Sequence, residues 1–123
     1  MVGGGTDTTL SITETRFIPL FGTDATASEA GVLQTLPVAG TLSNFRVTLH
    51  RWPDNGGGSQ FYAFTVRRNG VDTGITCNVL EFETACSDTT HSQLFNAGDT
   101  FAIRADPFGS PRDVMMHWTA VFN

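Results

Sequence analysis

The sequence predicts an all-β protein, an antiparallel β-sandwich of jelly-roll-like form with about eight to ten short strands. Short runs of alternating apolar and polar residues recur along the chain, and turn signals separate them roughly every ten residues. No stretch shows the longer period of an amphipathic helix. Asn69-Gly70 is the clearest hairpin signal, because both residues tolerate a positive φ. The 123 residues suit one domain with one hydrophobic core.

The N-terminal segment, residues 1–9, predicts a flexible arm, which leaves residues 10–123 as the single sandwich domain. The segment is rich in Gly and Thr and has no large apolar residue beyond Val2. Its three consecutive glycines lose much backbone entropy when ordered and offer no side chains to a core. It shows neither the basic nor the apolar region of a signal peptide, so none is expected.

The next part of the chain predicts strands of increasing length. Residues 16–21 are apolar, and Pro19 among them indicates an edge strand or a bend. Residues 22–30 are small and polar and suit a loop or one short helical turn. Residues 32–36 predict a short strand, and residues 41–50 predict a longer one with alternate side chains toward the core. The core-facing side chains of the longer strand are Phe45, Val47 and Leu49.

The centre of the chain predicts an exposed loop and then a hairpin. Residues 52–59 are rich in Gly and Asn, but no Lys-Ser or Lys-Thr follows the triglycine, so a phosphate-binding loop is excluded. Residues 61–66 have apolar side chains on both faces, which indicates a strand inside the sandwich or at a subunit contact. The strand after the Asn69-Gly70 turn has one apolar face. Its members are Val71, Thr73, Ile75, Cys77 and Val79.

The last third of the chain predicts two clear strands after a weaker, Thr- and Ser-rich stretch at residues 84–95. Residues 96–99 form a turn, and residues 100–105 then alternate. Residues 107–111 form a loop before the final strand at residues 114–122. The core-facing residues of that strand are Val114, Met116, Trp118, Ala120 and Phe122.

Cys77 and Cys86 are candidates for a disulfide. If Glu81 and Phe82 are at the top of a hairpin, residue 77 lies opposite residue 86, within disulfide reach. The alternative is a pair of reduced, buried thiols, as in a cytosolic protein. Zinc is disfavoured, because this spacing without a nearby pair of histidines is not a ligand pattern.

Composition excludes some partners. The net charge is −5, from 12 acidic and 7 basic residues, which disfavours a nucleic-acid binder. No apolar run is long enough to suggest a membrane partner. All seven basic residues are arginine, and interfaces are enriched in Arg and depleted in Lys. Genomic base composition is an alternative reason for this usage.

The sequence contains no recognisable catalytic motif. The histidines His50, His91 and His117 lie in different predicted segments, and no Gly-x-Ser-x-Gly elbow is present. Glu81 and Glu83 could form a carboxylate pair, but acidic residues at strand ends are more often turn formers. We therefore expect no enzyme activity, no cofactor and no metal.

Five residues are candidate partner contacts. Trp52 lies at the base of the Gly-rich loop and could stack on a sugar ring, although a Trp that packs on a strand end is commoner. Arg67 and Arg68 precede the hairpin turn and could contact an acidic partner, or they form a solvated hairpin end. Phe61 and Met115 lie on faces opposite the expected core.

The same reasoning predicts a homotrimer. Phe61, Ala63, Met115 and Val121 all lie opposite the expected core residues, which leaves apolar surface that a monomer should not expose. Closed symmetry would bury that surface.

Several motifs resemble a small β module that is common in phage and bacterial proteins. They are Asn69-Gly70-Val71-Asp72-Thr73, the paired cysteines with Ser87-Asp88-Thr89 after the second, and Gly98-Asp99 before an alternating strand. The resemblance extends over residues 32–123. This part of the chain is similar both to the capsid decoration or cement proteins of tailed phages and to C1q/TNF-like trimeric heads. It carries no catalytic residues.

The resemblance implies a structural virion protein that binds the lattice of the major capsid protein and stabilises the capsid. Such a protein would be made in the host cytoplasm and would lie on the capsid exterior. The alternative is an extracellular receptor- or glycan-binding head, such as a tail-fibre or spike tip or a bacterial adhesin-like module. Fold alone does not decide between these roles.

Overall fold

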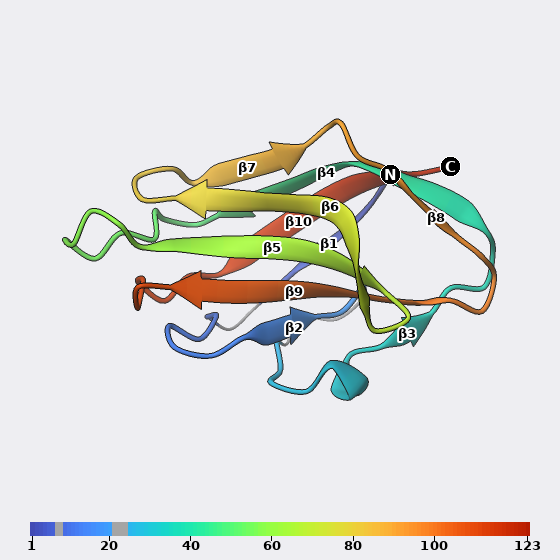
Figure 1. The fold of residues 1–123 in the computed structure, drawn as a ribbon, viewed down its shortest axis with the longest axis horizontal. Coiled ribbons are helices and arrows are strands. Elements are labelled where there is room, and N and C mark those ends of the chain that lie inside the picture. Colours follow the sequence, from blue (N-terminus) through green and yellow to red (C-terminus); the bar gives the residue numbers. More distant parts are fainter. Residues whose placement is uncertain (7–8, 21–24) are drawn as a thin grey trace.

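The computed structural model describes residues 1–6, 9–20 and 25–123. Over these residues the chain forms ten strands and one short 3-10 helix, η1, so the predicted all-β class is confirmed (Figure 1). The elements in order are β1 (Val2–Gly5), β2 (Arg16–Ile18), η1 (Glu29–Gly31), β3 (Gln34–Thr35), β4 (Gly40–Leu49), β5 (Phe61–Arg68), β6 (Val71–Leu80), β7 (Ala85–Asp88), β8 (Gln93–Phe95), β9 (Thr100–Phe108) and β10 (Met116–Phe122).

In the described part of the chain the strands form two antiparallel sheets that pack face to face. Sheet A has the order β1-β10-β4-β7, and β8 also pairs with β4. Sheet B has the order β2-β9-β5-β6, and β3 also pairs with β9. Strands from the two ends of the chain pair first, β1 with β10 and β2 with β9, and the pairing ends at the central β5–β6 hairpin. This order is that of a jelly roll.

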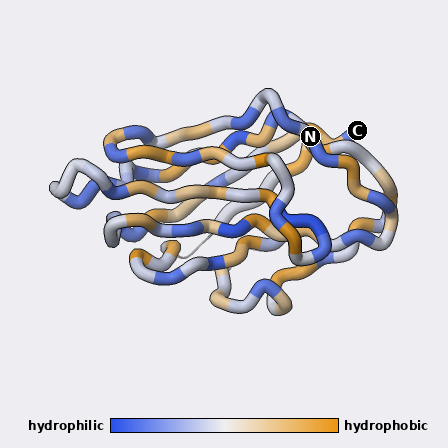
Figure 2. The backbone as a smooth tube through the Cα atoms, in the orientation of Figure 1, coloured by the Kyte–Doolittle hydropathy of each residue, from blue (hydrophilic) through white to orange (hydrophobic). Residues whose placement is uncertain are grey.

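Alternation along the strands builds the core between the sheets, and Figure 2 shows apolar and polar residues alternating along the backbone. In β4 the predicted core residues Phe45, Val47 and Leu49 are buried. In β10 Trp118 is buried, and its ring stacks on Phe101 of the opposite sheet with centroids 5.3 Å apart. Aromatic side chains from both sheets therefore fill the interior.

The predicted turn at Asn69-Gly70 is confirmed, because both residues have positive φ values, 52° and 76°. The strand after it departs from the prediction at its start. Val71 is 67% exposed, whereas Ile75 and the later alternate residues are buried. A register shift between β5 and β6 and a bend in β6 rotate the first residues of the strand away from the core (Figure 1).

The prediction of a flexible arm is wrong for residues 2–5, which form β1 at the edge of sheet A and pair with β10. Strand pairing uses only backbone groups, so glycines can join a sheet without contributing to the core. The close approach of the strands also favours glycine: a Cβ on Gly3 would lie 2.5 Å from the carbonyl oxygen of Trp118. Thr6 is buried and donates its N–H to the oxygen of Met116 at 2.9 Å. Residues 7 and 8 lie outside the described residues.

Cys77 and Cys86 form a disulfide, but the predicted β6–β7 ladder is wrong. The turn closes as expected, with the Glu83 N–H donating to the Leu80 oxygen at 2.7 Å. Beyond it β7 pairs with β4 of sheet A, whereas β6 belongs to sheet B. The disulfide therefore joins the two sheets at one edge, with Cα atoms 5.7 Å apart.

The polar segment at residues 22–30 contains one short helical turn, η1, which begins at Glu29. Residues 21–24, part of two predicted segments, lie outside the described residues. Within the described ranges, no helix has the length and apolar character needed to cross a membrane.

Candidate functional site

An exposed aromatic pair stands at the end of the sandwich where β6 ends and β5 begins (Figure 1, left). Trp52 and Phe82 are 44% and 60% exposed, and their rings meet edge to face with centroids 5.9 Å apart. The two loops that carry them are joined by the Asp54 N–H, which donates to the Glu81 oxygen at 3.0 Å. We call Trp52 and Phe82 the aromatic tip.

Hydrogen bonds hold the Gly-rich loop beneath the tip. Asp54 is 4% exposed, and its carboxylate accepts the N–H groups of Gly56 and Gly58 at 2.9 and 2.6 Å. The Arg112 N–H donates to the Pro53 oxygen at 2.7 Å, which ties the loop to the segment before β10. These bonds position Trp52 before any partner arrives, so less ordering entropy is lost on binding.

An apolar row lies on the outer face of sheet B at the same end. Leu80, Phe61 and Phe108 are direct cross-strand neighbours on β6, β5 and β9. The rings of Phe61 and Phe108 stack with centroids 4.5 Å apart. Leu80 and Phe108 remain 44% and 45% exposed. We call these three residues the apolar row.

The structure divides the side chains on which the homotrimer prediction was based. Phe61 and Ala63 lie on the outer face of sheet B, because the alternate residue Tyr62 is buried between the sheets. Val121 lies in β10 of sheet A, next to the buried Ala120. Met115 is partly buried at the end of the sandwich, where its N–H donates to Nδ1 of His50 at 3.0 Å. A cyclic trimer would have to use both sheet surfaces of each copy, one toward each neighbour, to bury all of these side chains.

Arg67 and Arg68 are bound within the protein instead of forming a solvated hairpin end. The Arg67 guanidinium pairs with Glu29 at 2.5 Å and with Asp72 at 2.6 Å, and its side chain is 16% exposed. The hydrogen bond that the Arg67 guanidinium donates to Glu29 is the main reason that the pKa of Arg67 is raised. Arg68 pairs with Asp99 at 2.7 Å. Neither charge is therefore fully available to a partner.

Two carboxylates are held in their charged form by hydrogen bonds. Asn69, the Asn96 N–H and Arg68 lower the pKa of Asp99 to about 2. Burial raises the pKa of Asp88, but the N–H groups of His91, Thr76 and Thr90 outweigh it and the pKa falls to about 2. The Thr76 N–H belongs to β6, so Asp88 at the end of β7 bridges the two sheets beside the disulfide.

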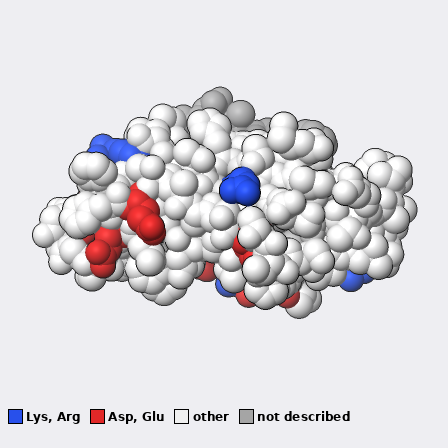
Figure 3. All heavy atoms as spheres, turned by 90° about the horizontal axis from the view of Figure 1, so that it is seen from above, with Lys and Arg blue, Asp and Glu red and all other residues white. Residues whose placement is uncertain are grey.

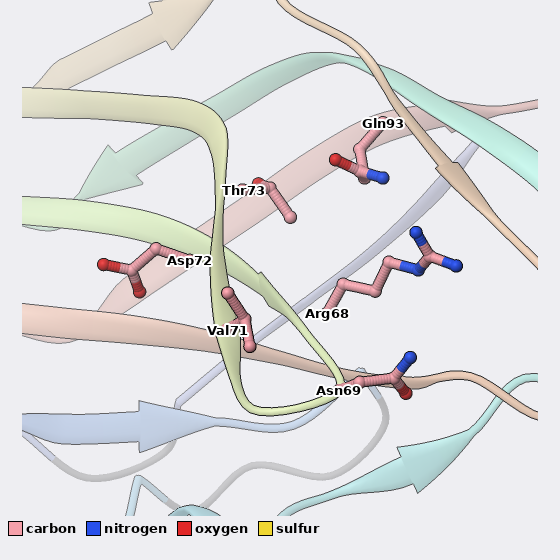
Figure 4. A pocket seen from close by; sticks show the side chains of 6 residues that line it. All are labelled: Arg68, Asn69, Val71, Asp72, Thr73 and Gln93. Carbon is pink, nitrogen blue, oxygen red and sulfur yellow. The ribbon is translucent and has the colours of Figure 1, made fainter.

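A polar hollow of about 360 Å³ opens beside the β5–β6 hairpin, at the end of the molecule opposite the tip (Figures 1 and 4). Arg68, Thr73 and Gln93 face one another across it, whereas Asp72 points away toward its arginine partners (Figure 4). The Thr73 hydroxyl donates to the Val66 oxygen, and the Gln93 amide donates to the Leu94 oxygen. Much of the lining is thus already hydrogen-bonded.

Among the described residues no group of three or more His, Cys, Asp or Glu side chains could hold a metal ion. His50 accepts the Met115 N–H, His91 contacts Asp88 and His117 is exposed on β10. No protein-family model matches the chain, and no curated protein matches its sequence. The surfaces described above offer contact area to a partner.

The structure brings Trp52 and Phe61 to the same end of the molecule and adds residues that the sequence did not single out. Leu80, Phe82 and Phe108 are exposed there as well. A phenylalanine between two glutamates at the top of a turn was a usable signal for Phe82, because a turn rarely buries its apex. Leu80 and Phe108 become neighbours of Phe61 only through the sheet register.

Proposed function

We propose that this protein is a structural virion protein that decorates a phage capsid and stabilises it by binding the major capsid protein lattice. The aromatic tip is the observation that carries the proposal. Trp52 and Phe82 contact each other and are left exposed at one end of an otherwise well-filled sandwich. Aromatic side chains that enter a desolvated pocket are the typical anchors of protein interfaces.

The exposed apolar area supports a binding role. Aromatic side chains offer roughly 150–250 Å² each, so Trp52, Phe82, Leu80 and Phe108 together leave on the order of 400 Å² exposed. The largest apolar patch on a monomer is roughly 300–600 Å² and is often functional. This area is less than the roughly 800 Å² per partner of a standard interface, so polar rim contacts would complete it.

A lattice explains how such a modest surface could suffice. Many copies on one capsid shell, or three copies in a trimer, engage together and raise the effective affinity without new contacts. In this proposal the protein is made in the host cytoplasm and acts on the exterior of the virion. The resemblance of its turn and cysteine motifs to phage decoration proteins supports the same role.

The test is co-sedimentation with undecorated capsids of the phage that encodes the chain. We expect Phe82→Ser and Trp52→Ser to weaken binding roughly 30-fold each, as loss of an interface anchor does. The matched control is Leu94→Ser, which removes an equally exposed apolar side chain from β8 at the opposite end. Wild-type protein that fails to bind the capsids would contradict the proposal.

The second candidate is a receptor- or glycan-binding head, and the polar hollow favours it. Arg68, Thr73 and Gln93 offer charged, hydroxyl and amide groups on a concave surface, and Trp52 elsewhere could stack on a sugar ring. Retention on a glycan array that Gln93→Ala abolishes, together with no binding to capsids, would support this role instead.

A further inference from the structure

Unpaired negative charge in the described part of the chain gathers at the aromatic tip. Elsewhere the described carboxylates each have an arginine or histidine partner, as the Glu29–Arg67 and Asp99–Arg68 pairs illustrate. The carboxylates without such a partner among these residues are Asp54, Glu81 and Glu83.

These carboxylates border the tip directly. Glu81 and Glu83 are exposed on either side of Phe82, and Asp54 follows Trp52 by two residues. Of the two arginines at this end, Arg51 is paired with Asp113, and Arg112 has no carboxylate partner within the described ranges, so the unpaired carboxylates outnumber the unpaired arginine. Figure 3 shows two acidic groups and one basic group at the same end, on a face whose remainder is mostly uncharged.

The acidic rim bears on which occupant can cover the tip. A second copy in a two-fold contact would bring the same glutamates together, and like charges across an interface are unfavourable. An anionic lipid surface would repel the rim for the same reason. A partner with apolar residues bordered by cationic side chains would complement both the aromatic tip and the carboxylates around it.

We infer that the aromatic tip binds a protein segment in which apolar residues are flanked by arginine or lysine. The inference rests on the proposed function, because it names the partner chemistry of the same docking surface. Phe82 and Trp52 fill the desolvated centre of the contact, and Glu81 and Glu83 pair with the cations at its rim. Rim charges of this kind set the association rate and its salt dependence.

The experiment selects a displayed library of random 12-residue peptides against the intact wild-type protein. We expect the enriched peptides to combine aromatic or Leu residues with an excess of Arg or Lys, and to bind more weakly as salt is raised. The double variant Glu81→Gln/Glu83→Gln should bind them with association roughly tenfold slower and lose most of the salt dependence. Phe82→Ser should abolish capture. Glu14→Gln, an exposed acid that precedes β2 and pairs with Arg16, is the matched control.

In the peptide selection, three outcomes overturn the inference: no enrichment, enrichment of neutral or acidic peptides, or equal binding by the double glutamine variant. Self-association that depends on Phe82, seen by light scattering, would assign the tip to a second copy and overturn it as well. Capsid binding that survives Glu81→Gln/Glu83→Gln would refute the cationic partner while leaving the proposed function intact. If the protein enriches cationic peptides but binds no capsid, the cationic partner is supported and the proposed function is refuted.

Discussion

At the scale of single residues, hydrogen bonds to charged groups decide several local structures. Asp54 organises the triglycine loop through backbone N–H groups, and Asp88 does the same at the edge of the sandwich. The donors to Asp54 come from its own loop, whereas Asp88 also accepts the Thr76 N–H from the opposite sheet. The several N–H donors to Asp88 strongly favour its charged form.

We predict that Asp88→Asn lowers the free energy of unfolding at pH 7 by about 2 kcal/mol. The pKa of Asp88 in the folded protein, about 2, lies below the unfolded value of roughly 3.9. The carboxylate therefore contributes stability above about pH 4 and loses it as the pH falls toward 2. Urea unfolding at pH 7 and at pH 2.5 measures both effects.

The matched control for this experiment is Glu14→Gln, whose side chain is 66% exposed and should leave stability nearly unchanged. The difference between Asp88→Asn and wild type should shrink at pH 2.5. An equal difference at both pH values would show that the carboxylate charge is not the cause.

Gly3 tests whether the N-terminal segment is a strand or an arm. We predict that Gly3→Ala destabilises the protein by about 1–3 kcal/mol, because the new Cβ would lie 2.5 Å from the rigid carbonyl oxygen of Trp118. Gly74→Ala is the control, since its Cβ would meet only the His91 ring at 3.6 Å. Thermal unfolding measures both variants, and a neutral Gly3→Ala would restore the flexible-arm interpretation.

At the scale of elements, the edge formed by β6 and β7 is where the two sheets are joined. The disulfide and the Asp88–Thr76 hydrogen bond cross the gap between the sheets within a few residues of each other. β7 has only four residues and one backbone partner, β4. Its position thus depends on these two links more than on strand pairing.

We predict that Cys77→Ser/Cys86→Ser lowers the free energy of unfolding by about 2–3 kcal/mol, the amount that closing so short a loop provides. Hydrogen exchange in β7 should accelerate more than in β10, which pairs on both sides. Non-reducing peptide mapping gives the state of the wild-type cysteines. Two free thiols in oxidised protein would count against the bridge.

At the scale of the whole molecule, exposed apolar side chains lie on two neighbouring surfaces. The apolar row lies on sheet B, and the aromatic tip projects from the adjacent end. The homotrimer remains a prediction, now with the apolar row as its contact, because Phe61 and Phe108 form a continuous stacked surface. Contact through the row would bury Leu80 and Phe108 and leave Trp52 and Phe82, about half of the exposed apolar area at this end, for a capsid.

We expect light scattering at micromolar concentration to give three times the chain mass of 13.3 kDa. Phe108→Ser should shift the protein toward a monomer, because it removes half of the exposed aromatic stack. Val121→Ser on the other sheet is the control and should leave the mass unchanged. A wild-type mass of 13.3 kDa would exclude a trimer of the isolated protein.

Local signals in the sequence determined the fold class, the positions of the longer strands and the hairpin turn. Asn69-Gly70 specifies its own backbone geometry, and alternation in residues 41–50 and 114–122 specifies which side chains face the core. The candidate site was visible in part, because Trp52 and Phe61 stand in a Gly-rich loop and on the outer face of a strand. These features depend on neighbours a few residues apart.

Only the tertiary structure decided what depends on long-range pairing. Arg67 meets Glu29, 38 residues earlier, and Arg68 meets Asp99, 31 residues later, so a basic hairpin end became a set of internal ion pairs. β7 left its sequence neighbour β6 for β4, which turned an expected hairpin bridge into a link between sheets. The glycines of β1 joined β10 because backbone pairing requires no side chain. Strand register between distant segments is set by the packing of the whole core, and no local pattern encodes it.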